Sequence, residues 1–178
     1  IQEDAYFNYA KLAFDLNNDP SVFDSYIRRY PEQAKGDRIY SYMALAALYN
    51  HDYAGAVEAY DKIDVLDADM KNNYMKANYL RADQLVSAGS YRSAIPCLKT
   101  AAYYSDKRTP FNQTARYWLA ESYYRSDDYA QSAEMYKNLY NTSALYGKKE
   151  GNLIPYNVAY CCFKENDFKS AADWFDTY

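Results

Sequence analysis

The sequence is poor in the residue types on which catalytic and metal sites depend. Among its 178 residues it has one histidine, so no pair of histidines can hold a metal, and three cysteines, too few for a disulfide framework. Its five glycines are scattered, and no glycine-rich phosphate loop or nucleophile motif occurs. We therefore predict a protein that is not an enzyme and needs no cofactor and no metal.

An excess of positive charge and a long apolar run are also missing. Lysine and arginine total 20 against 24 aspartates and glutamates, which gives a net charge of −4, whereas a nucleic-acid surface needs clustered cations. No run of about 18 apolar residues is present, so we expect no membrane span in this segment. The chain starts without methionine and stops at Tyr178 inside a repeat, which indicates a fragment of a longer chain.

One pattern recurs four times and organises the chain. A residue able to cap a helix is followed at once by an aromatic residue, then by a small residue three positions later and a large apolar residue four positions after that. The aromatic residues are 38, 38 and 39 residues apart, a period typical of stacked helix pairs. The copies are Asp52-Tyr53, Ala56, Tyr60; Ser90-Tyr91, Ala94, Leu98; Asp128-Tyr129, Ser132, Tyr136; and Asp167-Phe168, Ala171, Phe175.

This repeat predicts an all-α fold, a solenoid of about five antiparallel helix pairs in a single domain of residues 1–178. The predicted pairs are residues 1–31, 37–66, 74–104, 112–141 and 152–178. Two prolines bear on the boundaries. Pro96 predicts a late start or a kink in the third pair, and Pro155 marks the expected opening of the last pair.

Small residues recur where the helices of such a solenoid must meet. A methyl or hydroxymethyl group lets two helix axes approach to about 8–10 Å, whereas a bulky side chain would push the helices apart. We therefore expect these positions to be buried. They are Ala44, Ala82, Ala120 and Ala159 in the first helices of the pairs and Ala56, Ala94, Ser132 and Ala171 in the second helices.

Two pairs carry these positions most completely. They read Leu119-Ala120, Tyr123, Asp128-Tyr129, Ser132, Tyr136 and Val158-Ala159, Cys162, Asp167-Phe168, Ala171, Phe175. At these residues the sequence resembles the tetratricopeptide repeat family, from about residue 39 to the end, although its period exceeds the family's usual ~34 residues. The resemblance implies a right-handed superhelix that acts as a protein–protein interaction scaffold. The abundance of Tyr and Asn is also similar to tetratricopeptide proteins of Gram-negative cell envelopes, which would place the chain in the periplasm or at the outer membrane.

The resemblance implies that the first helices line a concave binding face for a protein or peptide partner. Positions next to the buried stripe then form an aromatic strip for an extended peptide or a helix, with charged residues that set its direction. The aromatic candidates are Tyr79, Tyr117, Tyr124, Tyr156, Tyr160 and Phe163, and the charged ones are Asp83, Glu121, Arg125 and Lys164. The alternative is that these tyrosines pack on neighbouring helices.

Two other functions are compatible with the sequence. Stacked tyrosines can hold the faces of sugars, so the chain could be a carbohydrate or small-ligand platform of an envelope nutrient-uptake system. A last pair without a cap could instead dock onto a second copy, which would make the chain a self-assembly module.

Overall fold

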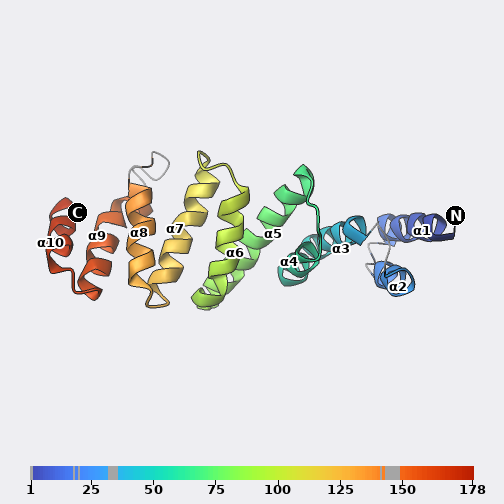
Figure 1. The fold of residues 1–178 in the computed structure, drawn as a ribbon, viewed down its shortest axis with the longest axis horizontal. Helices are drawn as coiled ribbons and strands as arrows, with labels where there is room; N and C mark the ends of the chain where they lie inside the picture. Colours follow the sequence, from blue (N-terminus) through green and yellow to red (C-terminus); the bar gives the residue numbers. More distant parts are fainter. Residues whose placement is uncertain (1, 18, 20, 32–35, 141, 143–148) are drawn as a thin grey trace. The chain divides into compact units, whose positions relative to one another are not determined.

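The structure is a computed structural model that describes residues 2–17, 19, 21–31, 36–140, 142 and 149–178. Within these ranges the chain forms ten helices and no strand, which confirms the all-α prediction (Figure 1). Ile1 and Asn141, which bound two predicted pairs, lie outside the described residues. The helices are α1 (Gln2–Asn17), α2 (Ser21–Arg29), α3 (Gly36–Tyr49), α4 (Tyr53–Asp61), α5 (Ala68–Ser87), α6 (Tyr91–Tyr104), α7 (Pro110–Tyr124), α8 (Tyr129–Tyr140), α9 (Lys149–Lys164) and α10 (Phe168–Thr177).

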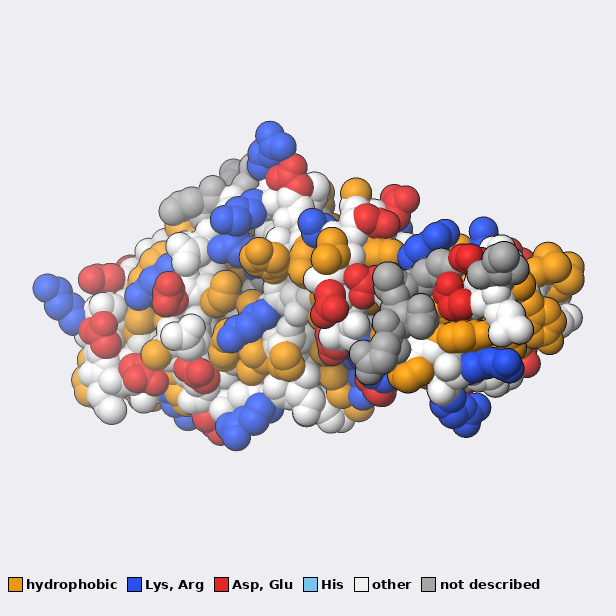
Figure 2. Space-filling view, turned by 45° about the vertical axis from the view of Figure 1, so that its right-hand side comes forward, with side chains coloured by type: hydrophobic (Ala, Val, Ile, Leu, Met, Phe, Trp, Pro, Cys, Tyr) orange, Lys and Arg blue, Asp and Glu red, His pale blue; other side chains and the backbone are white. Residues whose placement is uncertain are grey.

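The chain divides into two compact units, and the boundary lies within α5. Unit 1 is Ile1–Ala77 and unit 2 is Asn78–Tyr178. In unit 1, aromatic side chains from α1, α2 and α3 form one core, in which the Phe23 and Tyr42 rings stack with centroids 5.6 Å apart. The outer face of α1 is also apolar. Its Tyr9, Leu12 and Leu16 side chains are exposed, and hydrophobic side chains gather where α1 lies, at the right-hand end of Figure 2.

Unit 2 is built by helices that pack on the next helix along the chain. α6 packs on α7, α7 on α8, α8 on α9 and α9 on α10, while the end of α5 joins the core of α6 and α7 through Ala82. The small residues lie at these contacts, as predicted. None of the six in unit 2 is more than 3% exposed: Ala82, Ala94, Ala120, Ser132, Ala159 and Ala171.

Each copy of the repeated motif begins with the same turn. The residue before each cap has a positive φ, between 59° and 72°, and the N–H of the cap donates to the carbonyl five residues back. These are the features of a Schellman turn, which ends one helix as the cap starts the next. The four N–H donors and carbonyl acceptors are Asp52 to Ala47 (2.8 Å), Ser90 to Leu85 (2.8 Å), Asp128 to Tyr123 (3.0 Å) and Asp167 to Cys162 (2.9 Å).

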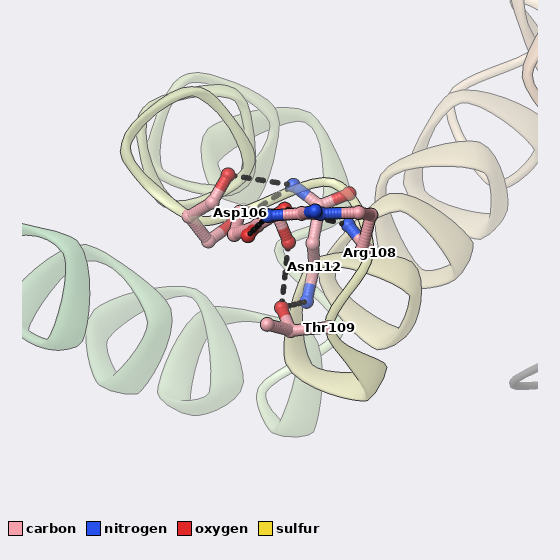
Figure 3. A network of polar contacts seen from close by, with 5 residues as sticks. Asp106, Arg108, Thr109 and Asn112 are labelled. Carbon is pink, nitrogen blue, oxygen red and sulfur yellow. Dashed lines mark hydrogen bonds and ion pairs between the residues drawn. The ribbon is translucent and has the colours of Figure 1, made fainter.

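The connection from α6 to α7 depends on one buried amide. Asn112 is 1% exposed, and its Nδ2 donates to the Ala102 carbonyl at 2.8 Å and to Ser105 Oγ at 2.9 Å. The Asn112 N–H in turn donates to Thr109 Oγ1 at 3.2 Å, which caps α7. Figure 3 shows this network together with the neighbouring Asp106 and Arg108. Asn112 therefore ties the start of α7 to the last turn of α6.

Replacing Asn112 by alanine is expected to lower the free energy of unfolding by about 1–3 kcal/mol, because the bonds from Nδ2 to the Ala102 carbonyl and to Ser105 Oγ are lost. Urea unfolding followed by tryptophan fluorescence measures the change. Asn138→Ala, at an exposed position of α8, is the matched control and should have little effect. Equal stabilities of the two variants would contradict the role given to Asn112.

Candidate functional site

The candidate site lies on the first helices of unit 2, the second half of α5, α7 and α9. We call it the first-helix face and define it by the predicted residues that remain at least partly exposed. Tyr156, Phe163, Asp83, Arg125 and Lys164 are exposed, and Tyr79, Glu121, Tyr124 and Tyr160 are half-buried. Of the predicted set, Tyr117 is in a different position and is described below.

A chain of aromatic rings joins α7 to α9 on this face. The rings of Tyr124 and Tyr160 meet edge to face with their centroids 5.9 Å apart. Tyr160 is also 6.3 Å from Tyr156 and 6.3 Å from Phe163, measured between ring centroids, along α9. Tyr156 is 41% exposed and Phe163 is 50% exposed. The two outer rings are thus held by Tyr160 and by aromatic rings of α10, while much of their surface stays accessible.

The charged residues of α7 are held in place by hydrogen bonds. Arg125 Nε donates to Glu121 Oε1 at 2.7 Å, and the Tyr136 hydroxyl donates to Glu121 Oε2 at 2.7 Å. The Arg125 guanidinium lies between two rings, 5.8 Å from the centroid of Tyr91 and 5.9 Å from that of Tyr124. The hydrogen bond that Arg125 donates to the Glu121 carboxylate raises the pKa of Arg125 above its usual value. Arg125 therefore stays charged, and its hydrogen bond to Glu121 fixes the position of the guanidinium group.

A second cation repeats this arrangement one pair later. Lys164 Nζ lies 5.8 Å from the ring centroid of Tyr129 and 5.4 Å from that of Tyr160. Tyr91 and Tyr129 are the aromatic residues of two successive motif copies, so each receives a cation from the end of the next first helix. Cation–aromatic contacts of this kind contribute about 0.5–1 kcal/mol at exposed sites.

The phenols of Tyr79 and Tyr124 are neutral donors at physiological pH. Burial raises the pKa of Tyr79 above its usual value, and the nearby Asp83 carboxylate raises it further. Burial also raises the pKa of Tyr124, with a smaller contribution from Tyr160. Both hydroxyls can therefore donate a hydrogen bond to a backbone carbonyl of a bound chain.

Tyr117 belongs to the core of unit 2. It is 8% exposed and lies in the cluster that α7, α8, α9 and α10 share, with its ring 5.7 Å from that of Tyr136. Tyr117 therefore packs on neighbouring helices, which was the alternative expectation for the tyrosines of the strip. We leave Tyr117 out of the first-helix face.

Comparison with known protein families identifies one segment of the chain. The tetratricopeptide repeat family model matches residues 79–144. This segment carries tetratricopeptide repeats. The match contains α7 and α8, which form the most regular pair of the sequence, and most of the first-helix face. No curated protein sequence matches the chain significantly.

Solved structures are similar in fold to this chain. The apo form of RapI is 10% identical, with 99% of this chain and 69% of that chain covered and a TM-score of 0.52. YrrB, a TPR protein described as having an unusual peptide-binding site, is 14% identical, with 98% and 84% covered and a TM-score of 0.50. MamA from Desulfovibrio magneticus RS-1 is 18% identical, with 98% and 92% covered and a TM-score of 0.47. At these identities the likeness extends to the fold alone.

The tetratricopeptide segment presents one aromatic residue that the sequence interpretation missed. Trp118 is 37% exposed and, with Tyr79, Asp83 and Val86 of α5, lines a shallow hollow between α5 and α7. The interpretation counted positions from the buried stripe and selected the adjacent Tyr117. Tryptophan occurs only twice in the sequence, and that rarity was the available signal. We include Trp118 in the first-helix face.

The described residues were also compared with what a metal site and a membrane span require. Among these residues, no group of three or more His, Cys, Asp or Glu side chains could hold a metal ion. Nor does any described helix have the length and apolar character needed to span a bilayer. The face therefore presents ring surface, phenol hydroxyls and fixed charges.

Proposed function

We propose that the chain is a protein–protein interaction scaffold that binds a peptide or a helix along the first-helix face of unit 2. The observation that carries the proposal is the joined ring series of Tyr124, Tyr160, Tyr156 and Phe163, which crosses from α7 to α9 and leaves its two outer rings 41% and 50% exposed. The tetratricopeptide match supports a protein partner over a carbohydrate.

Aromatic residues suit this role because they bring large contact areas with little loss of side-chain entropy. Tyrosine and tryptophan are enriched among the residues that dominate binding energies. Here Tyr124 and Tyr160 are already fixed by ring contacts, so a partner would not have to order them. A preformed ring surface of this kind favours an elongated segment laid across α7 and α9.

The charged residues would determine which way that segment runs. Asp83 on α5 adds exposed negative charge, while Arg125 on α7 and Lys164 on α9 add positive charge. The ion pair of Arg125 with Glu121, together with the bond from Tyr136, fixes the charges of α7 before a partner arrives. Such prearranged charges discriminate between orientations and partners more than they add affinity.

A peptide is the partner class that the similar fold of YrrB also supports, since that protein is described as having a peptide-binding site. A cell-envelope location belongs to the same proposal. Fractionation of source cells, with the chain detected by antibody, tests the location separately from the binding face.

Peptide selection from a display library against the intact chain tests the binding face. We expect selected peptides to lose about 30-fold or more in affinity for Tyr160→Ala, the loss typical of a central aromatic contact. Tyr103→Ala, at an 80% exposed position of α6, is the matched control and should bind normally. Circular dichroism melting of both variants excludes unfolding as the cause. Peptides that bind Tyr160→Ala with unchanged affinity would place the binding surface elsewhere.

A further inference from the structure

The hollow between α5 and α7 has an apolar floor and a charged edge. Ala82 and Leu98 lie at its floor and are 0% and 2% exposed, and Val86 beside them is half-buried. Asp83 and Trp118 complete this part of the lining, and both are exposed. All five residues belong to unit 2. One small region of the first-helix face therefore combines apolar surface, an accessible indole ring and a carboxylate.

The hollow is too small to enclose an aromatic ring. Its volume of about 10 Å³ holds no more than about one water. Its two aromatic walls are also held by other rings. The centroid of Tyr79 lies 4.7 Å from that of Phe111, and the centroid of Trp118 lies 5.9 Å from that of Tyr117. A partner side chain must therefore lie along the hollow, which favours a slim, unbranched stem.

Asp83 is a carboxylate that no described residue neutralises. Among the described residues, none forms an ion pair with it or donates a hydrogen bond to it. Glu121, by contrast, already accepts hydrogen bonds from Arg125 and Tyr136. Burial raises the pKa of Tyr79, and the charge of Asp83 raises it further, so this charge acts on its surroundings. The edge of the hollow therefore favours a cation from a partner.

We propose that the hollow binds an arginine side chain of the peptide partner, with its guanidinium group held by the Asp83 carboxylate and the Trp118 ring. The aliphatic stem of arginine is slim enough to lie over Ala82 and Leu98 and to cover the apolar surface there. The planar guanidinium pairs with a carboxylate through two hydrogen bonds and stacks on aromatic rings, whereas the ammonium group of lysine is a compact, strongly hydrated charge. This arginine belongs to the peptide proposed above, so its site rests on the proposed function.

The probes are the peptides selected from the display library against the intact chain, each compared with a version that carries citrulline in place of arginine. Citrulline has nearly the same shape as arginine but no charge. We expect the selected peptides to share an arginine at one aligned position. Citrulline there should weaken binding about tenfold, because a carboxylate pair and a cation–aromatic contact are both lost. Fluorescence anisotropy of the labelled peptides, titrated with the chain, measures the affinities.

Variants of the chain locate the contact. Asp83→Asn should weaken the arginine peptide about three- to fivefold but change the citrulline peptide less than about twofold, because both replacements remove the same contact. Trp118→Ala should likewise weaken the arginine peptide more than the citrulline peptide. Glu134→Gln, which neutralises an exposed carboxylate on α8, is the matched control and should bind both peptides normally. Circular dichroism melting verifies that each variant keeps its fold.

The outcomes distinguish this site from the proposed function. The arginine site would be overturned, and the ring series kept, by peptides that lose affinity for Tyr160→Ala but share no arginine. Equal responses of the arginine and citrulline versions to Asp83→Asn would have the same meaning. Peptides whose arginine depends on Asp83 but that bind Tyr160→Ala normally would support the arginine site and refute the ring series. A selection that yields no binding peptide would overturn both.

Discussion

Replacing Tyr136 by alanine is expected to lower the free energy of unfolding of unit 2 by about 3–5 kcal/mol. Tyr136 is fully buried in the core that α7, α8, α9 and α10 share, and its ring meets that of Tyr117 at 5.7 Å. Truncation leaves a large cavity between helices whose backbones are held by other contacts. It also removes the hydroxyl that donates to Glu121 at 2.7 Å. Both losses act in the same place, so this is the largest effect we predict for one substitution.

Urea unfolding followed by tryptophan fluorescence measures this change. Both tryptophans, Trp118 and Trp174, lie in unit 2, so the signal reports that unit even if the two units unfold separately. Tyr136→Phe keeps the ring and should cost about 1 kcal/mol, the net value of the lost hydrogen bond. Tyr103→Ala, at an exposed position of α6, serves as the control for truncation itself. A loss for Tyr136→Ala no greater than that for Tyr103→Ala would refute the cavity argument.

Replacing Ala120 by leucine is expected to destabilise unit 2 by about 3 kcal/mol, at the upper end of the usual range for overpacking. Ala120 is fully buried, and its carbonyl oxygen accepts a hydrogen bond from Ser132 Oγ at 3.0 Å. That bond holds α7 and α8 close together at the small residues of each helix. A leucine side chain there has no space to occupy unless the two helices separate, which would also break the bond.

The matched control is Ala130→Leu, the same change at an exposed position of α8, which should alter stability by no more than about 0.5 kcal/mol. Differential scanning calorimetry of both variants gives the comparison. A similar melting temperature for Ala120→Leu and the natural sequence would show that α7 and α8 tolerate a wider separation. The argument for small residues at all the equivalent positions would then be wrong.

Much of the fold could be predicted because each copy of the motif contains the residues that begin a helix and pack it on its neighbour. The cap, the aromatic residue and the small residue recur together, and each acts within one turn and one helix contact. The left-handed residue before the cap was less visible, since His51, Asp127, Asn166 and Gly89 share no side-chain type. Their backbone role follows from the hydrogen bonds of the turn, which a sequence does not display.

The prolines show where local signals were misleading. Pro96 predicted a late start or a kink for α6, and the late start is wrong, because the helix begins at Tyr91 and continues to Tyr104 with Pro96 inside it. Pro155 marked the expected opening of the last pair, yet α9 begins at Lys149. Pro155 is buried in α9, so packing with neighbouring helices stabilises a helix that proline alone would interrupt.

The first-helix face was harder to predict, because successive residues of a helix point about 100° apart. An offset of one position separates the buried Tyr117 from the exposed Trp118. Tyr124, Tyr160 and Phe163 were selected by the same counting and do lie in one connected group of rings. Counting along the sequence thus brought these rings together, but which residues of each helix stay exposed depends on how its neighbours rotate it.

The packing of successive helices in unit 2 has a consequence for how this part of the chain is made. Because α6 contacts α7, α7 contacts α8 and so on, few of the contacts require distant segments to find each other. Chains dominated by such local contacts fold quickly, since little loop-closure entropy is lost before the first contacts form. Each helix of unit 2 can therefore find its partner soon after it leaves the ribosome, without waiting for the rest of the sequence.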